Sequence, residues 1–428
     1  MTKIKIGIAG LGTVGGGLLR LLGDDARLSR QGAAFEIVGV CARDRHADRA
    51  MPVDAYAWHD DPAALAASDL DVFVELMGGA DGPALDAVRA ALSNGRSVVT
   101  ANKALMATHG PELAALAEER GGALRYEAAV GAGTPVIRGL RDGLAACVPQ
   151  TIAGILNGTC NFVLSEMART GAAYDDVVAE AQRLGFAEAD PSLDVGGHDA
   201  AHKLSVLATL AFDSRVDLAD IETTGIEAVR AEDMAEAARL GHGIKLMATA
   251  TLIDGRMALR VCPSLIAETS PLARARGPEN VFIIDADPVG RVGFTGPGAG
   301  DMATAAAVAA DLVTVAKGAT GPTYASPASA LRALPGDAAP DLVNAYYLRV
   351  PLRDEPGALA VIAKALGEHG VSIDTVAQRP REQDAQDLVI TTHPCTARDF
   401  RAALGALRGL SPIAAPPAAL PIADASYF

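Results

Sequence analysis

The sequence has few aromatic residues and fewer basic than acidic ones. Of its 428 residues, 4% are aromatic and only one is a tryptophan. Lys and Arg total 37 against 52 Asp and Glu, which gives a formal net charge of −15. A chain this acidic repels the phosphates of nucleic acids and anionic membrane surfaces, and the scarce aromatics offer few surfaces for base stacking. We therefore expect neither a nucleic acid nor a membrane as a partner.

Cysteines are also scarce, and they lie far apart. The five cysteines form no C-x-x-C motif, and their number is odd. This usage is typical of reduced thiols and argues against a disulfide scaffold or a zinc site. No apolar run reaches the ~20 residues of a transmembrane helix, and the chain opens with a strand-like run instead of a signal peptide. We expect a cytoplasmic protein.

The length predicts about three domains at roughly 150 residues each. Residues 1–135 alternate short apolar runs with helical stretches, which predicts an α/β domain on a parallel sheet. An Ala/Val-rich helix near 302–317 is expected to complete it. Residues 136–318 mix strands and helices, and we interpret them as a second, α+β domain.

A region rich in Ala, Pro, Gly and Ser, at 319–341, is predicted to be a linker. Residues 342–428 then follow the order β-α-β-β-α, with a further strand near Leu420. Four prolines crowd this last strand, so it is the weakest element of the prediction.

The clearest local motif is G-x-G-x-x-G, which follows a predicted strand at 4–9 and opens a helix. Gly10 permits the tight turn, Gly12 lets the backbone approach a pyrophosphate, and Gly15 allows close packing of helix on strand. The N-terminus of the helix adds N–H donors and partial positive charge. We therefore predict dinucleotide binding by the segment Gly10-Leu11-Gly12-Thr13-Val14-Gly15.

The end of the second strand should select the cofactor, because an acid there would bind the ribose 2′-hydroxyl of NAD. Glu36 lies at the start of the predicted strand 35–41, away from that position. Arg43 follows the end of the strand and is suited to a 2′-phosphate, which favours NADP. The neighbouring Asp44 leaves NAD open.

An acidic loop leads into a predicted helix at 199–212. Asp199 and Lys203 are four residues apart and share one face of that helix. A solvated salt bridge is the plain interpretation. However, the helix continues with largely apolar residues, and a partly buried lysine there would be a usable proton carrier for an alcohol substrate. Lys103, just past a predicted parallel strand at 97–100, is a second candidate, since such positions face the cofactor crevice.

These motifs, taken together, closely resemble those of the long, regulated form of homoserine dehydrogenase. Residues 342–428 resemble an ACT domain, a βαββαβ module that senses amino acids, through Asp354-Glu355-Pro356-Gly357-Ala358-Leu359. In order along the chain, the matching stretches are Gly10–Gly15, Val74-Glu75-Leu76-Met77-Gly78-Gly79, Thr100-Ala101-Asn102-Lys103, residues 126–135, Gly154-Ile155-Leu156-Asn157-Gly158-Thr159, residues 185–203 and Gly296-Pro297-Gly298-Ala299-Gly300.

The resemblance implies a Rossmann-type nucleotide domain, a substrate-binding and dimerisation domain, and a regulatory domain. The implied reaction interconverts L-homoserine and L-aspartate 4-semialdehyde, on the route to threonine, methionine and isoleucine. Lys203 would exchange the hydroxyl proton and Lys103 would assist, also touching the cofactor. The remaining implied contacts are Glu188, Asp194 and Asp199 with homoserine, and Gly185 and Gly300 with the cofactor.

Further ligands are implied by the resemblance alone. A monovalent cation such as Na⁺ would bind backbone carbonyls of Glu127, Val130, Ala132 and Thr134. Threonine is the implied effector of the ACT-like domain, at its 354–359 opening, and a homodimer or homotetramer is the implied assembly.

Two other functions stay open at this point. Cys160 stands where the family pattern has Thr, which raises the alternative of a thioester-forming semialdehyde dehydrogenase. That chemistry needs a base near the thiolate, and no motif places a histidine beside Cys160. The second alternative is a non-catalytic sensor of nucleotides and amino acids, which the presence of both Lys103 and Lys203 disfavours.

Overall fold

The computed structural model describes residues 3–24, 28–49, 51–318, 321–380 and 385–423. The chain folds into two compact units, each made of three stretches of sequence. The first comprises residues 1–150, 202–218 and 286–334; the second comprises 151–201, 219–285 and 335–428. Within the described ranges, every helix is too short or too polar to cross a membrane.

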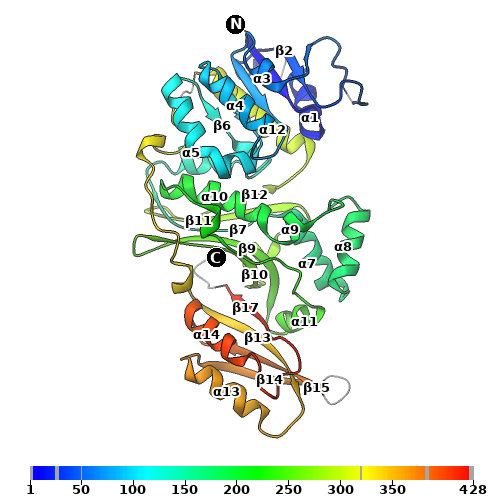
Figure 1. Ribbon diagram of the computed structural model, residues 1–428, viewed down its shortest axis with the longest axis vertical. Coiled ribbons are helices and arrows are strands. Elements are labelled where there is room, and N and C mark those ends of the chain that lie inside the picture. The colour runs from blue at the N-terminus through cyan, green and yellow to red at the C-terminus, as the bar shows by residue number, and fades with distance from the viewer. Residues whose placement is uncertain (1–2, 25–27, 50, 319–320, 381–384, 424–428) are drawn as a thin grey trace. The chain divides into compact units, whose positions relative to one another are not determined.

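The first unit is built on a parallel sheet of order β3-β2-β1-β4-β5-β6 (Figure 1). Every strand that pairs with β1 runs parallel to it, so the carboxyl ends of the strands share one edge. This confirms the parallel α/β domain predicted from the sequence. The strands are β1 (Ile4–Ala9), β2 (Phe35–Cys41), β3 (Ala57–His59), β4 (Val72–Glu75), β5 (Ser97–Thr100) and β6 (Leu124–Arg125).

Helices pack on this sheet through buried apolar residues. The core joins Ile6 and Ile8 of β1 to Leu18 of the first helix and Leu312 of the last, so a segment near residue 310 closes a core that begins at residue 4. Gly17 permits this approach, since a Cβ there would lie 2.9 Å from the Asp301 carbonyl oxygen. The helices are α1 (Thr13–Leu22), α3 (Pro62–Ala66), α4 (Pro83–Ser93), α5 (Lys103–Arg120) and α12 (Asp301–Ala316).

Helix α5 starts well before the proline that it contains. The proline at 111 suggests a start there, yet α5 begins at Lys103 and contains Pro111. Its cap is Asn102, whose side-chain oxygen accepts the Leu105 N–H at 3.0 Å. A proline is best tolerated in the first turn of a helix, which is why Pro111 suggests a start. The helix begins instead after Asn102, because this side chain caps it.

The second unit contains a largely antiparallel sheet of order β11-β7-β9-β10-β17-β13-β15-β14. The long hairpin of β9 and β10 forms its centre, with Arg256 opposite Ile253 and Ala267 opposite His242. Its non-C-terminal elements are β7 (Val148–Ile155), α7 (Gly158–Thr170), α8 (Tyr174–Arg183), α9 (Ser192–Val195), β8 (Glu222–Thr223), α11 (Ala231–Arg239), β9 (His242–Ile253), β10 (Arg256–Ala267) and β11 (Glu279–Asp287). Helix α10 (His198–Phe212) begins in this unit and ends in the first.

The C-terminal part of the second unit has the βαββαβ order of the predicted ACT-like module. Its helices α13 and α14 lie beside the strands (Figure 1), and the core between them contains Leu348, Ile362 and Phe400. The elements are β13 (Val343–Arg353), α13 (Ala358–Glu368), β14 (Ile373–Pro380), β15 (Ala385–Thr392), the short β16 (Cys395–Thr396), α14 (Ala397–Leu407) and β17 (Ala418–Ile422).

The last strand, doubted from its prolines, is present. Only Pro421 falls within β17, and the other three prolines precede it. Residues Ala418–Ile422 pair antiparallel with β13, and Ile422 also pairs in parallel with Leu265 of β10. The doubt was wrong because a single proline removes only one N–H from a five-residue strand.

Side-chain ion pairs reinforce this joint between β13 and the middle sheet. Asp233 of α11 accepts both Arg349 nitrogens, Nε at 2.6 Å and Nη2 at 3.0 Å, and the Tyr347 hydroxyl at 3.0 Å. Burial opposes the charge of Arg349, but its hydrogen bonds with Asp233 outweigh this effect and raise its pKa. The joint is therefore held by a buried, charge-balanced pair.

Candidate active site

The turn between β1 and α1 has the geometry that the glycine motif predicts. Gly10 has a φ of 98°, and a Cβ there would lie 2.4 Å from the Leu76 carbonyl oxygen. A Cβ on Gly15 would lie 2.2 Å from the Gly10 carbonyl oxygen, so only glycine allows α1 to sit this close. Nothing lies within 4 Å of the Cβ position of Gly12. The first turn of α1 therefore offers unbonded N–H groups beside an open backbone, a geometry suited to phosphate.

A cavity of about 890 Å³ adjoins this turn. The lining consists of the turn itself (Gly10, Leu11 and Gly12) and residues at the ends of β2 and β4, among others. The Gly10 N–H donates to the Cys41 carbonyl at 2.9 Å and so holds the turn beside the end of β2. Arg43 and Asp44 are both exposed in this lining, whereas Glu36 lies at the other end of β2 and outside it. The geometry thus keeps Arg43, and not Glu36, as the group that would reach a ribose or its phosphate.

Arg49 was not predicted, and it shapes the same cavity. Its guanidinium donates to the carbonyl oxygens of Arg45 and Ala47, each at 3.1 Å, and to that of Asp44. The Arg49 guanidinium also lies 5.6 Å from the ring centroid of Trp58, within the range of a cation–π contact. Arg49 therefore fixes the loop that presents Arg43.

Glu75 links the ends of β4 and β5, and it too was not predicted. This carboxylate is fully buried and accepts the N–H groups of Met77 and Gly78 at 2.7 and 3.1 Å. It also accepts the Thr100 hydroxyl at 2.5 Å. Burial raises the pKa of Glu75, although these hydrogen bonds oppose the shift. The network fixes the cavity wall after β4 and the end of β5, from which Lys103 follows as the first residue of α5.

Helix α12 brings Gly300 to the nucleotide turn. Gly300 is its N-cap, with a φ of 120°, and the next residue, Asp301, forms an ion pair with Arg20 of α1. Asp301, Gly12 and Thr13 line one cavity of about 440 Å³. The structure therefore places Gly300 beside the predicted cofactor site, about 290 residues away in sequence.

In the second unit, one amide joins two of the predicted substrate carboxylates. The side-chain nitrogen of Asn157 donates to Asp194 Oδ1 at 2.7 Å and to Asp199 Oδ2 at 2.9 Å. The Asn157 oxygen accepts the Cys160 N–H at 2.8 Å and so caps α7. The Thr159 hydroxyl adds a bond to Asp194 Oδ2 at 3.2 Å. Asn157 thus positions both carboxylates with a neutral group.

Helix α10 carries Asp199 and Lys203 one turn apart. Asp199 is 5% exposed and Lys203 8% exposed, which excludes a solvated surface salt bridge. Glu188 and Gly185 lie instead on the exposed loop before α9, where Gly185 has a φ of 78°. The turn between β1 and α1 and the Asp194–Asp199 pair belong to different units. A joint site for cofactor and substrate therefore stays a prediction.

Cys160 lies inside the protein. It is fully buried on α7, and its thiol donates to the Asp194 carbonyl oxygen at 3.1 Å. A nucleophile for a semialdehyde must be reached by its substrate, so this environment fits a packed thiol and disfavours the thioester chemistry.

The loop with the predicted cation ligands turns sharply at Ala132, whose φ is 47°. The Glu127 carboxylate is used inside the protein, accepting the N–H groups of Ile137 and Arg138 at 2.9 Å, and the Glu127 backbone carbonyl accepts the Val130 N–H at 3.5 Å. The Thr134 hydroxyl is buried and has no hydrogen-bond partner among the described residues. An orphaned oxygen at this loop fits a missing cation ligand. No cluster of three His, Cys, Asp or Glu that could hold a metal occurs in the described part of the chain.

Asp311 and Arg138 complete a buried ionic network behind this loop. Arg138 donates to Glu127 Oε2 at 3.0 Å and to Asp311 Oδ1 at 2.8 Å, and Asp311 accepts the Glu127 N–H. Two carboxylates thus share one guanidinium. Burial, with the charge of Glu127 adding to it, raises the pKa of Asp311 to about 6.

Comparisons with known proteins agree along the whole chain. Family models described as the NAD-binding domain of homoserine dehydrogenase, homoserine dehydrogenase and the ACT domain match residues 10–127, 135–313 and 346–411. Curated homoserine dehydrogenases from Neisseria gonorrhoeae and Pseudomonas aeruginosa are each 39% identical. Each alignment covers 97% of this chain and 98% of the relative.

Solved structures give the same result. A homoserine dehydrogenase from Thiobacillus denitrificans is 37% identical, covers 99% of both chains and has a TM-score of 0.91. A hyperthermophilic archaeal homoserine dehydrogenase in complex with NADPH is 27% identical, with a TM-score of 0.64, over 73% of this chain and 97% of its own.

Proposed function

Because the chain belongs to the homoserine dehydrogenase family of oxidoreductases acting on CH–OH groups, we propose that it interconverts L-homoserine and L-aspartate 4-semialdehyde. The step would lie in the synthesis of threonine, methionine and isoleucine. The observation that carries the proposal is the Asp194–Asn157–Asp199 bridge. A neutral amide fixes the two carboxylates, and one of them, Asp199, shares helix α10 with the buried Lys203. This arrangement suits a substrate that bears both an ammonium and a hydroxyl group.

In this proposal each side chain has a defined task. A bound nicotinamide would accept the hydride from the carbon of the alcohol. Lys203 Nζ would exchange the hydroxyl proton, and Lys103 would polarise the same oxygen from the nucleotide side. Asp199, Asp194 and the exposed Glu188 would hold the substrate ammonium. Asn157 acts as a positioning residue, because it touches the two aspartates and not the reacting atoms.

For the cofactor we propose NADP over NAD. The NAD-binding domain supports a nicotinamide nucleotide. The finer choice rests on Arg43, which lies in the cavity lining past the end of β2, where no acidic residue precedes it on the strand end. Besides Arg43, the proposed contacts are the segment Gly10–Gly15, Lys103, Gly185 and Gly300. With Asp44 adjacent, NAD is the second choice.

We also propose a structural Na⁺ on the backbone carbonyls of Glu127, Val130, Ala132 and Thr134. The sharp turn at Ala132 and the orphaned Thr134 hydroxyl support it. A cation there would stabilise the loop between η1 (Glu127–Ala129) and Pro135. It would take no part in proton or hydride transfer.

The ACT-like module is proposed to regulate the enzyme. Its matched ACT domain supports an amino-acid effector, with threonine the first candidate at the Asp354–Leu359 opening, within a homodimer or homotetramer.

The five cysteines are all free thiols, which supports a reducing compartment and hence the cytoplasm.

The direct test is homoserine oxidation by the full-length protein, followed through absorbance of the reduced nicotinamide with NADP and NAD in turn. We expect turnover with homoserine and a higher kcat/KM with NADP. Oxidation of the semialdehyde to an acyl product, in place of its reduction, would contradict the proposal.

A further inference from the structure

Another cavity, of about 410 Å³, lies in the second unit where the ACT-like module meets the middle sheet. Its volume is at the lower end of the ~300–1,000 Å³ range of small-molecule sites. One wall comes from β8 and β10 of the middle sheet, and the other from β13, α14 and β17. A ligand here would contact both parts of the second unit at once.

The wall from β13 contains buried polar groups that form no hydrogen bond of normal geometry. Tyr346 is 4% exposed and lines the cavity, and its hydroxyl forms no such bond among the described residues, although the side chains of Arg260 and Asn344 interact with it. Its ring is fixed by stacking on Phe400, with centroids 3.7 Å apart and planes at 6°. Asn344, two residues before it on the same strand face, is also buried, and neither of its amide atoms forms a hydrogen bond of normal geometry. Buried polar atoms without partners are rare, and they commonly mark a missing water or ligand.

The opposite wall supplies charges of both signs. Arg260 of β10 is 6% exposed and lies in register with Glu222 of β8. Burial raises the pKa of the Tyr346 hydroxyl, and the positive charge of Arg260 opposes this shift, so the two groups act on one another. At the rim Glu222 forms an ion pair with Arg401 of α14. The cavity thus combines a buried cation, a second cation and one carboxylate.

We propose that this cavity binds an α-amino acid with a small side chain, as a site separate from the Asp354–Leu359 opening and independent of the proposed reaction. The ligand carboxylate pairs with Arg260 and accepts the Tyr346 hydroxyl. Its ammonium pairs with Glu222. The side chain lies against the apolar part of the lining, which includes Ala397, Leu404 and Leu420. Glu222 disfavours a phosphate or a dicarboxylate by like-charge repulsion.

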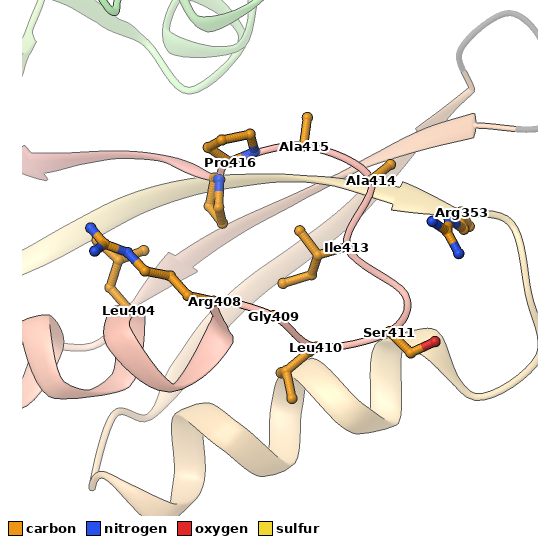
Figure 2. A pocket seen from close by; sticks show the side chains of 11 residues that line it. Arg353, Leu404, Arg408, Gly409, Leu410, Ser411, Ile413, Ala414, Ala415 and Pro416 are labelled. Atoms are coloured by element: carbon orange, nitrogen blue, oxygen red, sulfur yellow. The ribbon is translucent and has the colours of Figure 1, made fainter.

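The larger cavity of the same module lacks these features. It measures about 750 Å³, and Figure 2 shows Arg408 and Arg353 at its opposite ends with Ile413 between them. Both arginines and Ser411, the polar side chains of its lining, are exposed. It therefore offers no buried polar group to a charged ligand.

The test uses thermal unfolding and calorimetric titration of the full-length protein with glycine, L-alanine, L-serine, L-threonine and L-valine. Tyr346→Phe removes only a hydroxyl that forms no hydrogen bond of normal geometry, so the fold should be kept. We expect it to weaken binding of the preferred amino acid ~5–10-fold, and Glu222→Gln to weaken it ~10-fold or more. The matched controls are Ser411→Ala in the cavity of Figure 2, Asp354→Asn at the opening and Asp199→Asn in the candidate active site.

Binding that weakens in Tyr346→Phe and Glu222→Gln, but in none of the controls, supports the inference. Binding lost only in Asp354→Asn places the effector at the opening, and loss only in Asp199→Asn identifies a substrate analogue; each result overturns the inference. Absence of binding by all five amino acids overturns it as well. Homoserine oxidation, measured separately, shows whether the proposed reaction stands in each case.

Discussion

The carboxylates of the candidate active site and those of the ACT joint are held in opposite ways. Asp194 and Asp199 receive the two bonds of a neutral amide, Asn157, at 2.7 and 2.9 Å. Asp233 at the joint instead receives two nitrogens of Arg349 and the Tyr347 hydroxyl. An amide fixes a carboxylate without neutralising it, whereas a guanidinium does both.

This difference distinguishes carboxylates that suit ligand binding from carboxylates that hold two elements of the fold together. The amide positions a carboxylate without bringing a charge of its own, and such an arrangement suits a substrate ammonium. A fully buried carboxylate such as Asp233, which receives two nitrogens of one arginine, contributes to holding two elements together and is closed to a ligand. Breaking the first arrangement should therefore cost activity, and breaking the second should cost stability.

The largest effect is expected from Lys203→Ala on the active-site side. Loss of the proton carrier should lower kcat by ~10²–10⁴-fold, the usual range of general acid–base catalysis. Cofactor affinity, measured by fluorescence titration, should barely change. Near-normal turnover would remove Lys203 from the mechanism.

On the joint side, Asp233→Ala should destabilise the protein by ~3–5 kcal/mol, because it leaves Arg349 buried without its main partner. Chemical unfolding measures the change. Glu180→Ala, which breaks the exposed pair with Arg183, is the matched control and should leave stability unchanged. Equal small losses in both variants would show that burial of the joint carries no penalty.

Asp311 sharpens the comparison, because it shares one arginine with a second carboxylate. Its pKa rises from 3.8 in the unfolded chain to about 6 when folded, so the native state binds the proton more tightly. Stability should then fall as pH rises from about 4 to 6, by ~3 kcal/mol, and level off above 6. Asp311→Asn should remove this part of the slope, as measured by unfolding at each pH. Parallel curves for the two proteins would contradict the assignment.

Arg43 is an exposed arginine of the cofactor cavity, with an expected role in binding and none in assembly. Arg43→Ala should weaken NADP ~10–100-fold, the worth of a charge-assisted hydrogen bond or two. NAD affinity and the unfolding free energy should not change. If both cofactors weaken equally, Arg43 does not contact the 2′-phosphate.

The smallest effect is expected at Cys160. In Cys160→Ser the new hydroxyl can donate to the Asp194 carbonyl as the thiol does, so most homoserine oxidation should remain. A variant that is folded by circular dichroism but inactive would support the alternative in which the Cys160 thiolate is the nucleophile.

Local features were predictable from the sequence because their causes are local. The strands 4–9 and 35–41 are apolar runs with clear ends, and the tasks of Gly10 and Gly15 follow from their spacing. The burial of Lys203 was expected from the apolar residues after it. Each of these rests on a pattern within about one element.

Long-range partners were not predictable in this way. Asn157 meets Asp194 and Asp199 from 37 and 42 residues away, and Glu75 meets Thr100 from 25. A single acid in the apolar run of β4 was the one local sign of Glu75, whereas Asn157 resembled an ordinary helix cap. The strand β17 was underestimated because its pairing with β13 and β10 lies outside any local pattern.

The position of β17 also bears on how the chain is made. Strand β10 ends at Ala267, and the strand that pairs with Leu265 begins at Ala418, about 150 residues later. At ~5–20 residues per second, a ribosome needs roughly 8–30 s to supply it. Strand β8, which is made before β10, already pairs with Arg260 and Val261 on β10, so throughout that interval it is the stretch around Leu265 that is open to pairing with other nascent chains. Newly made molecules should therefore be most prone to aggregate until β17 has been synthesised, and slowing synthesis between β10 and β17 should increase aggregation.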